Sequence, residues 1–302
     1  MENQASMKTL PLDSNFLAIE DQYSSLERSK IAILSAPYEH TVSYGGGTKL
    51  GPSAIIAASH FVEFFDEETE RELCFEKGIA TLEPLDFGES SDEDALEIIY
   101  RSVSDLLAQE KFVATLGGEH TISVAPIRAH ATKYPGMSIL HFDAHSDLRA
   151  EYQGNKYSHA SALARALDFF PPEKLVQVGI RAEGKDEWEF IKERGVKTFY
   201  AHAIRSGIHG EHWQRSVFDA LSDDVYITFD VDYFDPAIMP TTGTPEPGGF
   251  FWDETMKLLR MVGKEKRIVG FDVVELAPDD RFPAPTYLTA KLLYRMLNFA
   301  FS

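Results

Sequence analysis

The sequence predicts an α/β protein that folds as a single three-layer αβα domain around a mainly parallel sheet. Strand-like runs alternate with segments of helical periodicity along most of the chain. Several of these runs are apolar almost throughout, such as KFVATL at 111–116 and RIVGF at 267–271, as expected for strands that are covered on both faces. No Pro/Ser-rich linker and no internal repeat divides the 302 residues. We therefore expect one domain over residues 1–302, in which residues 1–29 form an N-terminal extension.

Each expected element follows from its local pattern. Short apolar runs predict strands at 30–36, 111–116, 137–145, 175–180, 196–201, 225–232 and 267–275. Longer segments with apolar residues at helical spacing predict helices at 52–65, 92–108, 121–133, 158–169, 186–194, 211–221, 253–261 and 285–300. Pro52 and Pro285 lie near the starts of two of these helices, where a missing backbone N–H costs nothing. In such sheets ligands bind at the carboxyl ends of the strands, so we expect the functional residues there.

Charge and cysteine content exclude several classes of function. Lysine and arginine number 29 against 48 aspartates and glutamates, and the net charge of −19 repels nucleic acid phosphates but not cationic ligands. The single cysteine, Cys74, excludes an intramolecular disulfide. The N-terminal sequence MENQASMKTL lacks the apolar core of a secretory signal, so we expect a cytoplasmic protein. No uncharged apolar run approaches the roughly 20 residues that cross a bilayer, which argues against a membrane role.

Acidic residues and histidines follow three of the predicted strands. The segment 138–142 runs into Asp-Ala-His-Ser-Asp, 225–229 runs into Asp-Val-Asp, and 111–116 runs into Gly-Gly-Glu-His. If the chain stays extended, the alternating residues of the first two motifs lie on one side of each strand. The candidate metal ligands from the three strand ends are His120, Asp143, His145, Asp147, Asp230 and Asp232.

Such a cluster requires positive charge. Desolvation and mutual repulsion would raise the pKa of each clustered carboxyl group unless cations compensate. Four aspartates carry −4, which two divalent ions balance. Mixed carboxylate and imidazole ligands suit Mn²⁺ better than metals that prefer thiolates, although Zn, Ni and Co stay open. Alone, Asp-Ala-His-Ser-Asp is as compatible with a solvated loop as with a metal site, Asp-Val-Asp fits a loop better, and Gly-Gly-Glu-His is a weak signal. Only their joint occurrence at three strand ends favours a metal centre.

The chain resembles the ureohydrolase superfamily of arginases and agmatinases from about Ile31 to its C-terminus. The motifs that carry the resemblance are GGEH (117–120), DAHSD (143–147), SHAS (158–161), FDVDYFDP (229–236), TGTPEPGG (242–249) and GFDVVELAP (270–278). The resemblance implies an arginase-like fold, two Mn²⁺ ions per subunit and a homo-oligomer, either a trimer or a hexamer. The sequence departs from the common family pattern at Glu119, where the family usually has the aspartate of GGDH, and at Ala160, where glycine is frequent.

The resemblance also assigns roles to single residues. It implies that His120, Asp143, Asp147 and Asp230 hold one metal and that Asp143, His145, Asp230 and Asp232 hold the other. Asp147 counts as a catalytic residue as well as a ligand. The two metals would activate a water molecule for attack on the guanidinium carbon.

Three further residues would serve the substrate. His159 would be a proton shuttle for the leaving amine and would contact the substrate, because histidine titrates near neutral pH. Glu275 would pair with the guanidinium group, and Thr244 would add a hydrogen bond near the metals. The alternatives are a surface or capping histidine at 159 and a plain turn residue at 244.

Agmatine, cleaved to urea and putrescine, is the expected substrate. Arginases hold the amino-acid part of their substrate with polar residues that are not recognisable here in the stretches 148–152 and 179–184. The segment 36–44 also looks like the N-terminal loop of agmatinases, and no Gly-Lys-Ser/Thr follows that would make it a phosphate-binding loop. N1-aminopropylagmatine, guanidinobutyrate, guanidine or arginine remain alternative substrates. A catalytically idle, acidic oligomeric binding protein is the alternative from another class.

Overall fold

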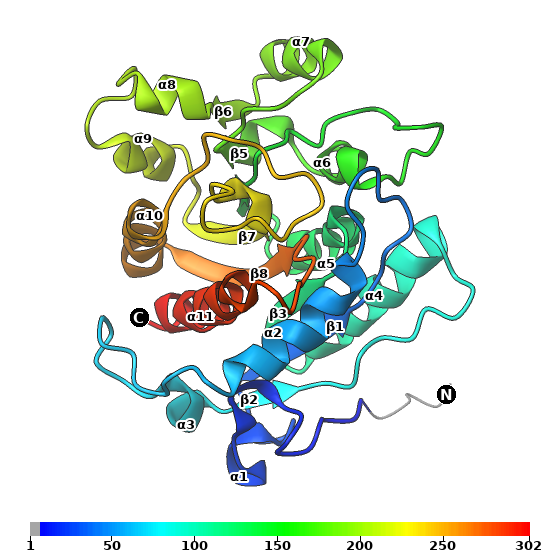
Figure 1. Cartoon of the computed structure of the whole chain (residues 1–302), viewed down its shortest axis with the longest axis vertical. Helices are drawn as coiled ribbons and strands as arrows, with labels where there is room; N and C mark the ends of the chain where they lie inside the picture. Colours follow the sequence, from blue (N-terminus) through cyan, green and yellow to red (C-terminus); the bar gives the residue numbers. More distant parts are fainter. Residues whose placement is uncertain (1–6) are drawn as a thin grey trace.

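The computed structural model describes residues 7–302 and contains an eight-stranded sheet at its centre (Figure 1). All strand pairs are parallel, and the strand order is β2-β1-β3-β8-β7-β4-β5-β6. The strands are β1 (Ile31–Ala36), β2 (Ile79–Thr81), β3 (Phe112–Gly117), β4 (Ser138–Phe142), β5 (Leu175–Val178), β6 (Lys197–Phe199), β7 (Asp224–Asp230) and β8 (Arg267–Val274).

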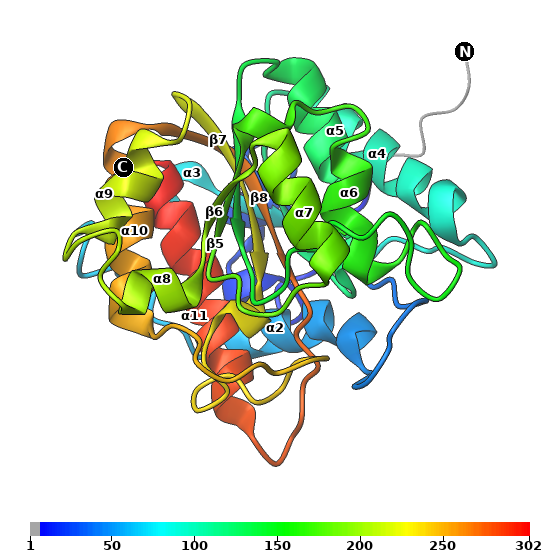
Figure 2. The same cartoon turned by 90° about the horizontal axis from the view of Figure 1, so that it is seen from above.

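Helices cover both faces of the sheet. The α-helices are α1 (Asp21–Ser24), α2 (Gly51–Ser59), α3 (Leu73–Lys77), α4 (Asp92–Ala108), α5 (Val124–Lys133), α6 (Ala162–Ala166), α7 (Lys185–Arg194), α8 (Ala201–Arg205), α9 (Trp213–Asp219), α10 (Trp252–Glu265) and α11 (Pro283–Ala300). Seen from above, α4, α5, α6 and α7 lie on one side of the sheet, and α8, α9, α10 and α11 lie on the other (Figure 2). The result is the three-layer αβα arrangement that the sequence predicts.

Both faces of the strands are apolar because each face meets a layer of helices. In β1, Ile31 and Ile33 belong to the core under α2 and α11, whereas Ala32 and Leu34 belong to the core under α4 and α5. All six residues of β1 are buried. This two-sided burial explains why alternation of polar and apolar residues is absent from the central strands.

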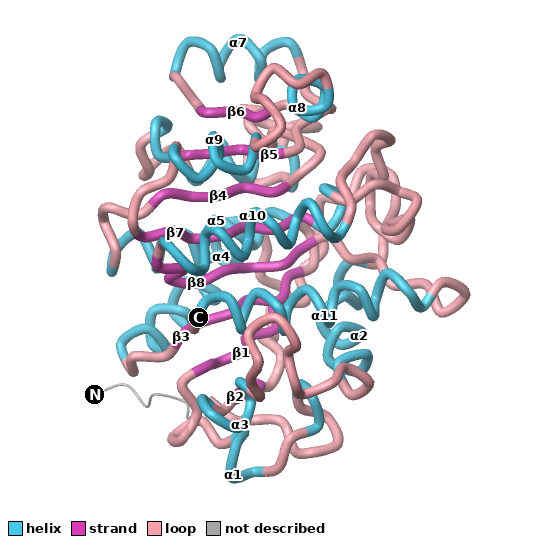
Figure 3. The backbone as a smooth tube through the Cα atoms, turned by 90° about the vertical axis from the view of Figure 1, so that its left-hand side faces the viewer, coloured by secondary structure: helices cyan, strands magenta, loops and turns pink. Residues whose placement is uncertain are grey.

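The chain order of the strands creates a crossover in the middle of the sheet. The chain leaves β3 and skips two positions to form β4, and the last two strands then fill the gap, so that β8 and β7 lie between β3 and β4 (Figure 3). The carboxyl ends of four neighbouring strands, β3, β8, β7 and β4, therefore meet at one rim. Reversals of strand order of this kind are the usual positions of ligand sites in parallel sheets.

The predicted fold class is confirmed, although individual elements differ, among them the short helices α1, α3 and α8, which were not predicted. The short strand β2 was not predicted, because three residues after Gly78 are too few for a recognisable pattern. The expected helix 158–169 is shorter, comprising η4 (His159–Ser161) and α6. The extension predicted over 1–29 stays a prediction, since residues 1–6 lie outside the described part. Within residues 7–302, no helix combines the length and the apolar character that a membrane crossing requires.

Candidate metal centre

The sequence-predicted ligands converge at the rim formed by β3, β8, β7 and β4. His120 begins η3 (His120–Ser123) just after β3, residues 143–147 follow β4, and Asp230 ends β7. The Nδ1 atom of His120 lies 3.0 Å from Asp143 Oδ2, 3.0 Å from Asp147 Oδ2 and 3.4 Å from Asp230 Oδ2. The structure therefore brings together side chains from three strand ends that are up to 110 residues apart in sequence.

His145 connects Asp232, the last of the six candidate ligands, to the same cluster. Its Nδ1 atom lies 2.9 Å from Asp232 Oδ2 and 3.6 Å from Asp143 Oδ1. Asp143 thus contacts both histidines, one through each carboxylate oxygen. All six predicted ligands form one connected group.

The local route to this convergence differs from the expected one. The extended segments predicted at 137–145 and 225–232 end earlier, at Phe142 and Asp230, so strand alternation does not align the acidic residues. Asp232 instead lies in η6 (Val231–Tyr233), where its N–H donates to Asp230 Oδ1 at 2.8 Å. Asp147 has a φ of 53°, a left-handed conformation that is uncommon outside glycine. The predicted alignment of these residues along extended strands is therefore wrong, although their side chains do meet.

Hydrogen bonds behind His120 fix which of its ring nitrogens carries the proton. His120 Nε2 lies 3.0 Å from the hydroxyl of Thr228, and that hydroxyl donates to Asp272 Oδ1 at 2.7 Å. Tyr226 and Ser123 also donate to this buried carboxyl group, at 2.7 and 2.8 Å. Because the single hydroxyl hydrogen of Thr228 goes to Asp272, Thr228 accepts from His120 Nε2–H. A neutral His120 therefore presents the lone pair of Nδ1 to the aspartates.

This lone pair tests whether the residues fit a metal ion. His120 Nδ1 is fully buried and has no hydrogen-bond partner, yet three carboxylate oxygens surround it within 3.4 Å. Burial alone lowers the pKa of His120, but the close carboxylates of Asp143, Asp147 and Asp230 outweigh it and hold the pKa well above its ordinary value. A proton and a metal cation thus compete for Nδ1. Imidazole and carboxylate donors in this arrangement fit a divalent cation.

The electrostatics of the aspartates point the same way. Burial, followed by the negative charges of Asp232 and Asp143, raises the pKa of Asp230 well above its ordinary value. Burial and the charge of Asp143 likewise raise the pKa of Asp232. The pKa of Asp143 is held well below its ordinary value, because three histidines outweigh the effect of burial. Cations placed between these groups would relieve the repulsion.

His141, which was not among the predicted site residues, lies beside the cluster. His141 Nε2 lies 2.7 Å from Asp143 Oδ2, and Gln177 Nε2 donates to His141 Nδ1 at 3.1 Å. Gln177 therefore directs the proton of His141 to Nε2, from which it donates to Asp143 and orients that carboxylate. The position two residues before Asp143 on β4 was the available signal, but buried strand histidines are common without a role.

Two backbone features hold His120 and Glu275 in place. The carbonyl oxygen of Tyr38 accepts from the N–H of Glu119 at 2.9 Å, and a Cβ on Gly118 would lie 2.0 Å from that oxygen. Only glycine permits this close approach. Glu275 has a φ of 66°, and its Oε1 accepts from the backbone N–H of His120 at 2.7 Å. Such backbone strain is characteristic of functional positions.

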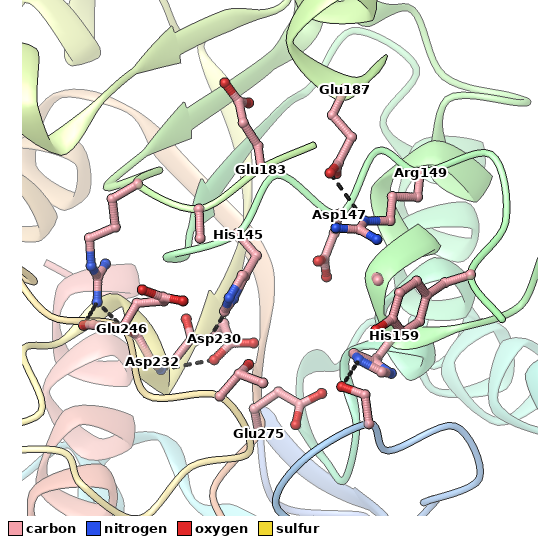
Figure 4. Close-up of a pocket in the computed structure, with 16 residues that line it drawn as sticks. His145, Asp147, Arg149, His159, Glu183, Glu187, Asp230, Asp232, Glu246 and Glu275 are labelled. Carbon is pink, nitrogen blue, oxygen red and sulfur yellow. Dashed lines mark hydrogen bonds and ion pairs between the residues drawn. The ribbon is translucent and has the colours of Figure 1, made fainter. Parts of the chain in front are cut away.

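A cavity of about 420 Å³ opens above the cluster. The predicted site residues that line it are His145, Asp147, His159, Asp230, Asp232, Thr244 and Glu275. Except for Thr244, these residues are labelled in Figure 4, where their side chains point toward a common space. His120 and Asp143 are buried beneath this surface. The structure thus brings all of the predicted site residues to one place.

The loop after β1 brings two hydroxyl groups to His159, neither of which was among the predicted site residues. Thr41 Oγ1 lies 3.2 Å from His159 Nδ1, and Ser43 Oγ lies 3.3 Å from His159 Nε2. The ring of Tyr152 packs edge-on against His159 with 5.9 Å between centroids. Thr41 lies 118 positions before His159, so no local sequence pattern indicates that the two are in contact.

The outer part of the cavity carries more acid than base. Glu187 accepts from Arg149 Nε at 3.2 Å, so these two charges compensate each other. Arg181 donates to backbone carbonyl groups, including those of Asp232 and Glu246, at 2.7 and 2.8 Å. Glu183 accepts from Ser146 at 2.6 Å but forms no ion pair among the described residues, and the same is true of the Glu246 side chain. The cavity therefore suits a cationic ligand.

Comparison with known proteins assigns this architecture to a family. The model of the arginase family matches residues 29–298. An N(1)-aminopropylagmatine ureohydrolase of Thermus thermophilus is 36% identical over 284 residues, covering 93% of this chain and 94% of that protein. An agmatinase of Bacillus cereus is 35% identical over 262 residues, covering 85% of this chain and 86% of that protein.

Solved structures agree. The agmatine ureohydrolase of Thermoplasma volcanium superposes with a TM-score of 0.83 at 31% identity, covering 93% of this chain and 92% of that one. Sequence relatives and structural neighbours span nearly the whole of the described domain, including the rim where the candidate metal ligands lie. The chain therefore belongs to the arginase family and is a ureohydrolase.

Proposed function

We propose that the protein is a dinuclear manganese hydrolase that cleaves agmatine to urea and putrescine. The observation that carries the proposal is the lone pair of His120 Nδ1 among three carboxylate oxygens, directly beneath an acidic cavity. His120, Asp143, Asp147 and Asp230 would hold one ion. Asp143, His145, Asp230 and Asp232 would hold the other, so that Asp143 and Asp230 bridge. When bound, the two ions would lower the pKa of water and supply a nucleophile near neutral pH.

Glu275 is the proposed acceptor for the guanidinium group. Burial and the charge of Glu119 raise its pKa well above the ordinary value, although the N–H of His120 and the charge of that ring oppose this. An arriving guanidinium cation therefore stabilises the ionised form, and its planar N–H groups match a carboxylate. Thr244 lines the same wall of the cavity and would contact the same group.

We expect Glu275→Gln to lower kcat/KM, with a loss of transition-state stabilisation of about 2–3 kcal/mol, because a charged hydrogen bond to the substrate becomes a neutral one. Urea release over a range of agmatine concentrations measures this, with metal content checked on the same samples. Glu173→Gln, at an exposed position outside the cavity, is the matched control. Unchanged kcat/KM in Glu275→Gln would place the guanidinium elsewhere.

His159 and Asp147 are the proposed groups for proton transfer. Both line the cavity, on the side opposite to Asp232 in Figure 4. A nitrogen leaving group of a guanidinium requires a proton to depart as a neutral amine, and histidine supplies protons near neutral pH. Asp147 contacts His120 and also faces the cavity, so it can accept a proton from water there.

Glu183 and Glu246 support a substrate with a cationic tail. Both are partly exposed in the cavity wall and lack a cationic partner among the described residues. Agmatine carries one ammonium group beyond its guanidinium, and N1-aminopropylagmatine carries two amino groups. The second compound is the alternative substrate, favoured by the relative of that name at 36% identity. Arginine is disfavoured, because its carboxylate would approach these two acids.

A panel of guanidino compounds tests the function. We expect Mn²⁺-loaded protein to release urea from agmatine with the highest kcat/KM among agmatine, N1-aminopropylagmatine, guanidinobutyrate, guanidine and arginine. A higher value for N1-aminopropylagmatine would transfer the assignment to that substrate. Protein that binds two equivalents of Mn²⁺ and releases no urea from any of the five would contradict a hydrolase.

The family resemblance also supports a cytoplasmic homo-oligomer, which we propose as a trimer or a hexamer. Light scattering at several protein concentrations measures the mass directly. A mass of 33.9 kDa, that of one chain, would contradict the oligomer.

A further inference from the structure

Glu119 is a fully buried acid to which the proposed reaction assigns no role. Its Oε2 accepts from the backbone N–H groups of His40 and Thr41, at 2.8 and 2.7 Å. Its Oε1 accepts from the hydroxyls of Thr41 and Thr121, both at 2.9 Å. All four partners donate, which is the pattern of an ionised carboxylate. Glu119 therefore fixes the loop after β1 to the end of β3.

Thr41 passes this constraint on to His159. Its one hydroxyl hydrogen goes to Glu119, because a carboxylate at 2.9 Å is a stronger acceptor than a neutral ring nitrogen at 3.2 Å. The oxygen then has its lone pairs free, and it accepts from the backbone N–H of His159 at 3.0 Å. The contact with His159 Nδ1 can be a hydrogen bond only if Nδ1 carries the proton.

We propose that Glu119 and Thr41 are positioning residues that hold neutral His159 with its proton on Nδ1. The lone pair of Nε2 then faces the cavity, where Ser43 Oγ lies 3.3 Å away. If His159 is the proton shuttle of the proposed function, on which this mechanistic consequence rests, Nε2 is the atom that takes up and releases the proton.

Other neighbours of the ring do not supply this constraint. Ser158 Oγ lies 3.5 Å from His159 Nδ1, at the limit of hydrogen-bond distance and farther than Thr41 Oγ1 at 3.2 Å, so it is the weaker contact. Tyr152 contacts the ring edge-on, which restricts rotation but does not select a nitrogen. The length of the side chain at 119 matters as well, because an aspartate is one methylene shorter and cannot keep all four contacts without a shift of the loop.

Glu119→Gln should reverse the direction of the hydrogen bonds. Two backbone N–H groups face Oε2, so the glutamine oxygen must occupy that place and its NH₂ group must face Thr41. Thr41 then accepts from glutamine and donates to His159 Nδ1, which moves the ring proton to Nε2. Thr41→Val removes the oxygen that accepts from Nδ1–H, so the ring proton should no longer be held on Nδ1. Thr41→Ser keeps the hydroxyl and should keep the proton on Nδ1.

The test is the ¹⁵N NMR spectrum of protein with labelled histidines, loaded with diamagnetic Zn²⁺, at about pH 9, above the ordinary pKa of histidine. The signal of His159 among the 10 histidines is the one that disappears in His159→Gln. We expect the proton on Nδ1 in the unchanged protein and in Thr41→Ser, and on Nε2 in Glu119→Gln. Thr121→Val is the matched control, since Thr121 bonds the same carboxylate but reaches no atom of His159, and it should keep the proton on Nδ1. A proton that stays on Nδ1 in both Glu119→Gln and Thr41→Val would overturn the proposal.

Kinetics on Mn²⁺-loaded protein provide the second readout. We expect Thr41→Val to lower kcat about 10-fold with KM changed by less than about 2-fold, a part of the usual contribution of a general acid. At equal metal content, the kcat of Thr41→Ser should lie within about 3-fold of the kcat of the unchanged protein. A Thr41→Ser protein as slow as Thr41→Val would contradict the proposal. If His159→Gln turned over normally, the shuttle role would fail, while the NMR result would still decide where the ring proton lies.

Discussion

Asp230→Ala is expected to abolish urea release and the binding of at least one metal ion. Asp230 lies 3.4 Å from His120 Nδ1 and belongs to both proposed ligand sets, so its removal takes an oxygen from each ion at once. Loss of a bridging ligand also leaves His120 without one of its three acidic neighbours. Urea assays and elemental analysis of the same dialysed sample measure both effects.

Thermal unfolding separates a lost metal centre from a lost fold. A ligand that binds only the native state raises Tm, so Mn²⁺ should stabilise the unchanged protein and should stabilise Asp230→Ala much less. Without added metal, the variant should unfold no earlier than the unchanged protein. The reason is that burial, followed by the charges of Asp232 and Asp143, disfavours ionised Asp230 and raises its pKa. Asp168→Ala, an exposed position with the same change of charge, is the control. Full turnover by Asp230→Ala would exclude the proposed centre.

His159→Gln is expected to lower kcat by about 10²-fold or more, the usual contribution of a positioned general acid. The side chain contacts Thr41 and Ser43 but none of the proposed metal ligands within hydrogen-bond distance. Metal content should therefore stay unchanged, and so should the rise of Tm with Mn²⁺. Single-turnover urea release, combined with metal analysis, measures the effect on the chemical step.

The control for this prediction is His202→Gln, at an exposed position of α8 outside the cavity. It should leave kcat and metal content as they are. Loss of metal in His159→Gln would mean that His159 is a ligand and that the ligand sets are misassigned. Normal kcat with normal metal content would remove His159 from the reaction.

The fold was largely predictable because each central strand is a continuous apolar run. Segments such as Phe112–Gly117 and Arg267–Val274 cannot be amphipathic helices, and their burial on both faces follows from composition alone. The edge strand Ile79–Thr81 was not predictable, since it has only three residues and β1 is its one neighbouring strand in the described sheet. Its position depends on tertiary contacts rather than on a local pattern.

The candidate site divides in the same way. The acidic motifs stand at strand ends, so their convergence follows from the topology of a parallel sheet. The loop geometry did not follow, because the positive φ of Asp147 and the turn at Asp232 depend on neighbours from other strands. Thr41 and His141 carry no motif of their own. Their relevance arises only from distances to His159 and Asp143, which sequence spacing does not encode.

The position of β8 has a consequence for how the molecule is assembled during synthesis. This strand is the last to be made, yet it lies between β3 and β7 at the centre of the sheet. A nascent chain that ends before residue 267 lacks the wall on which His120 and Asp230 are held together. Contacts over such long sequence separations form slowly. The cluster around His120 and Asp230 can therefore be completed only after this last strand has joined the sheet.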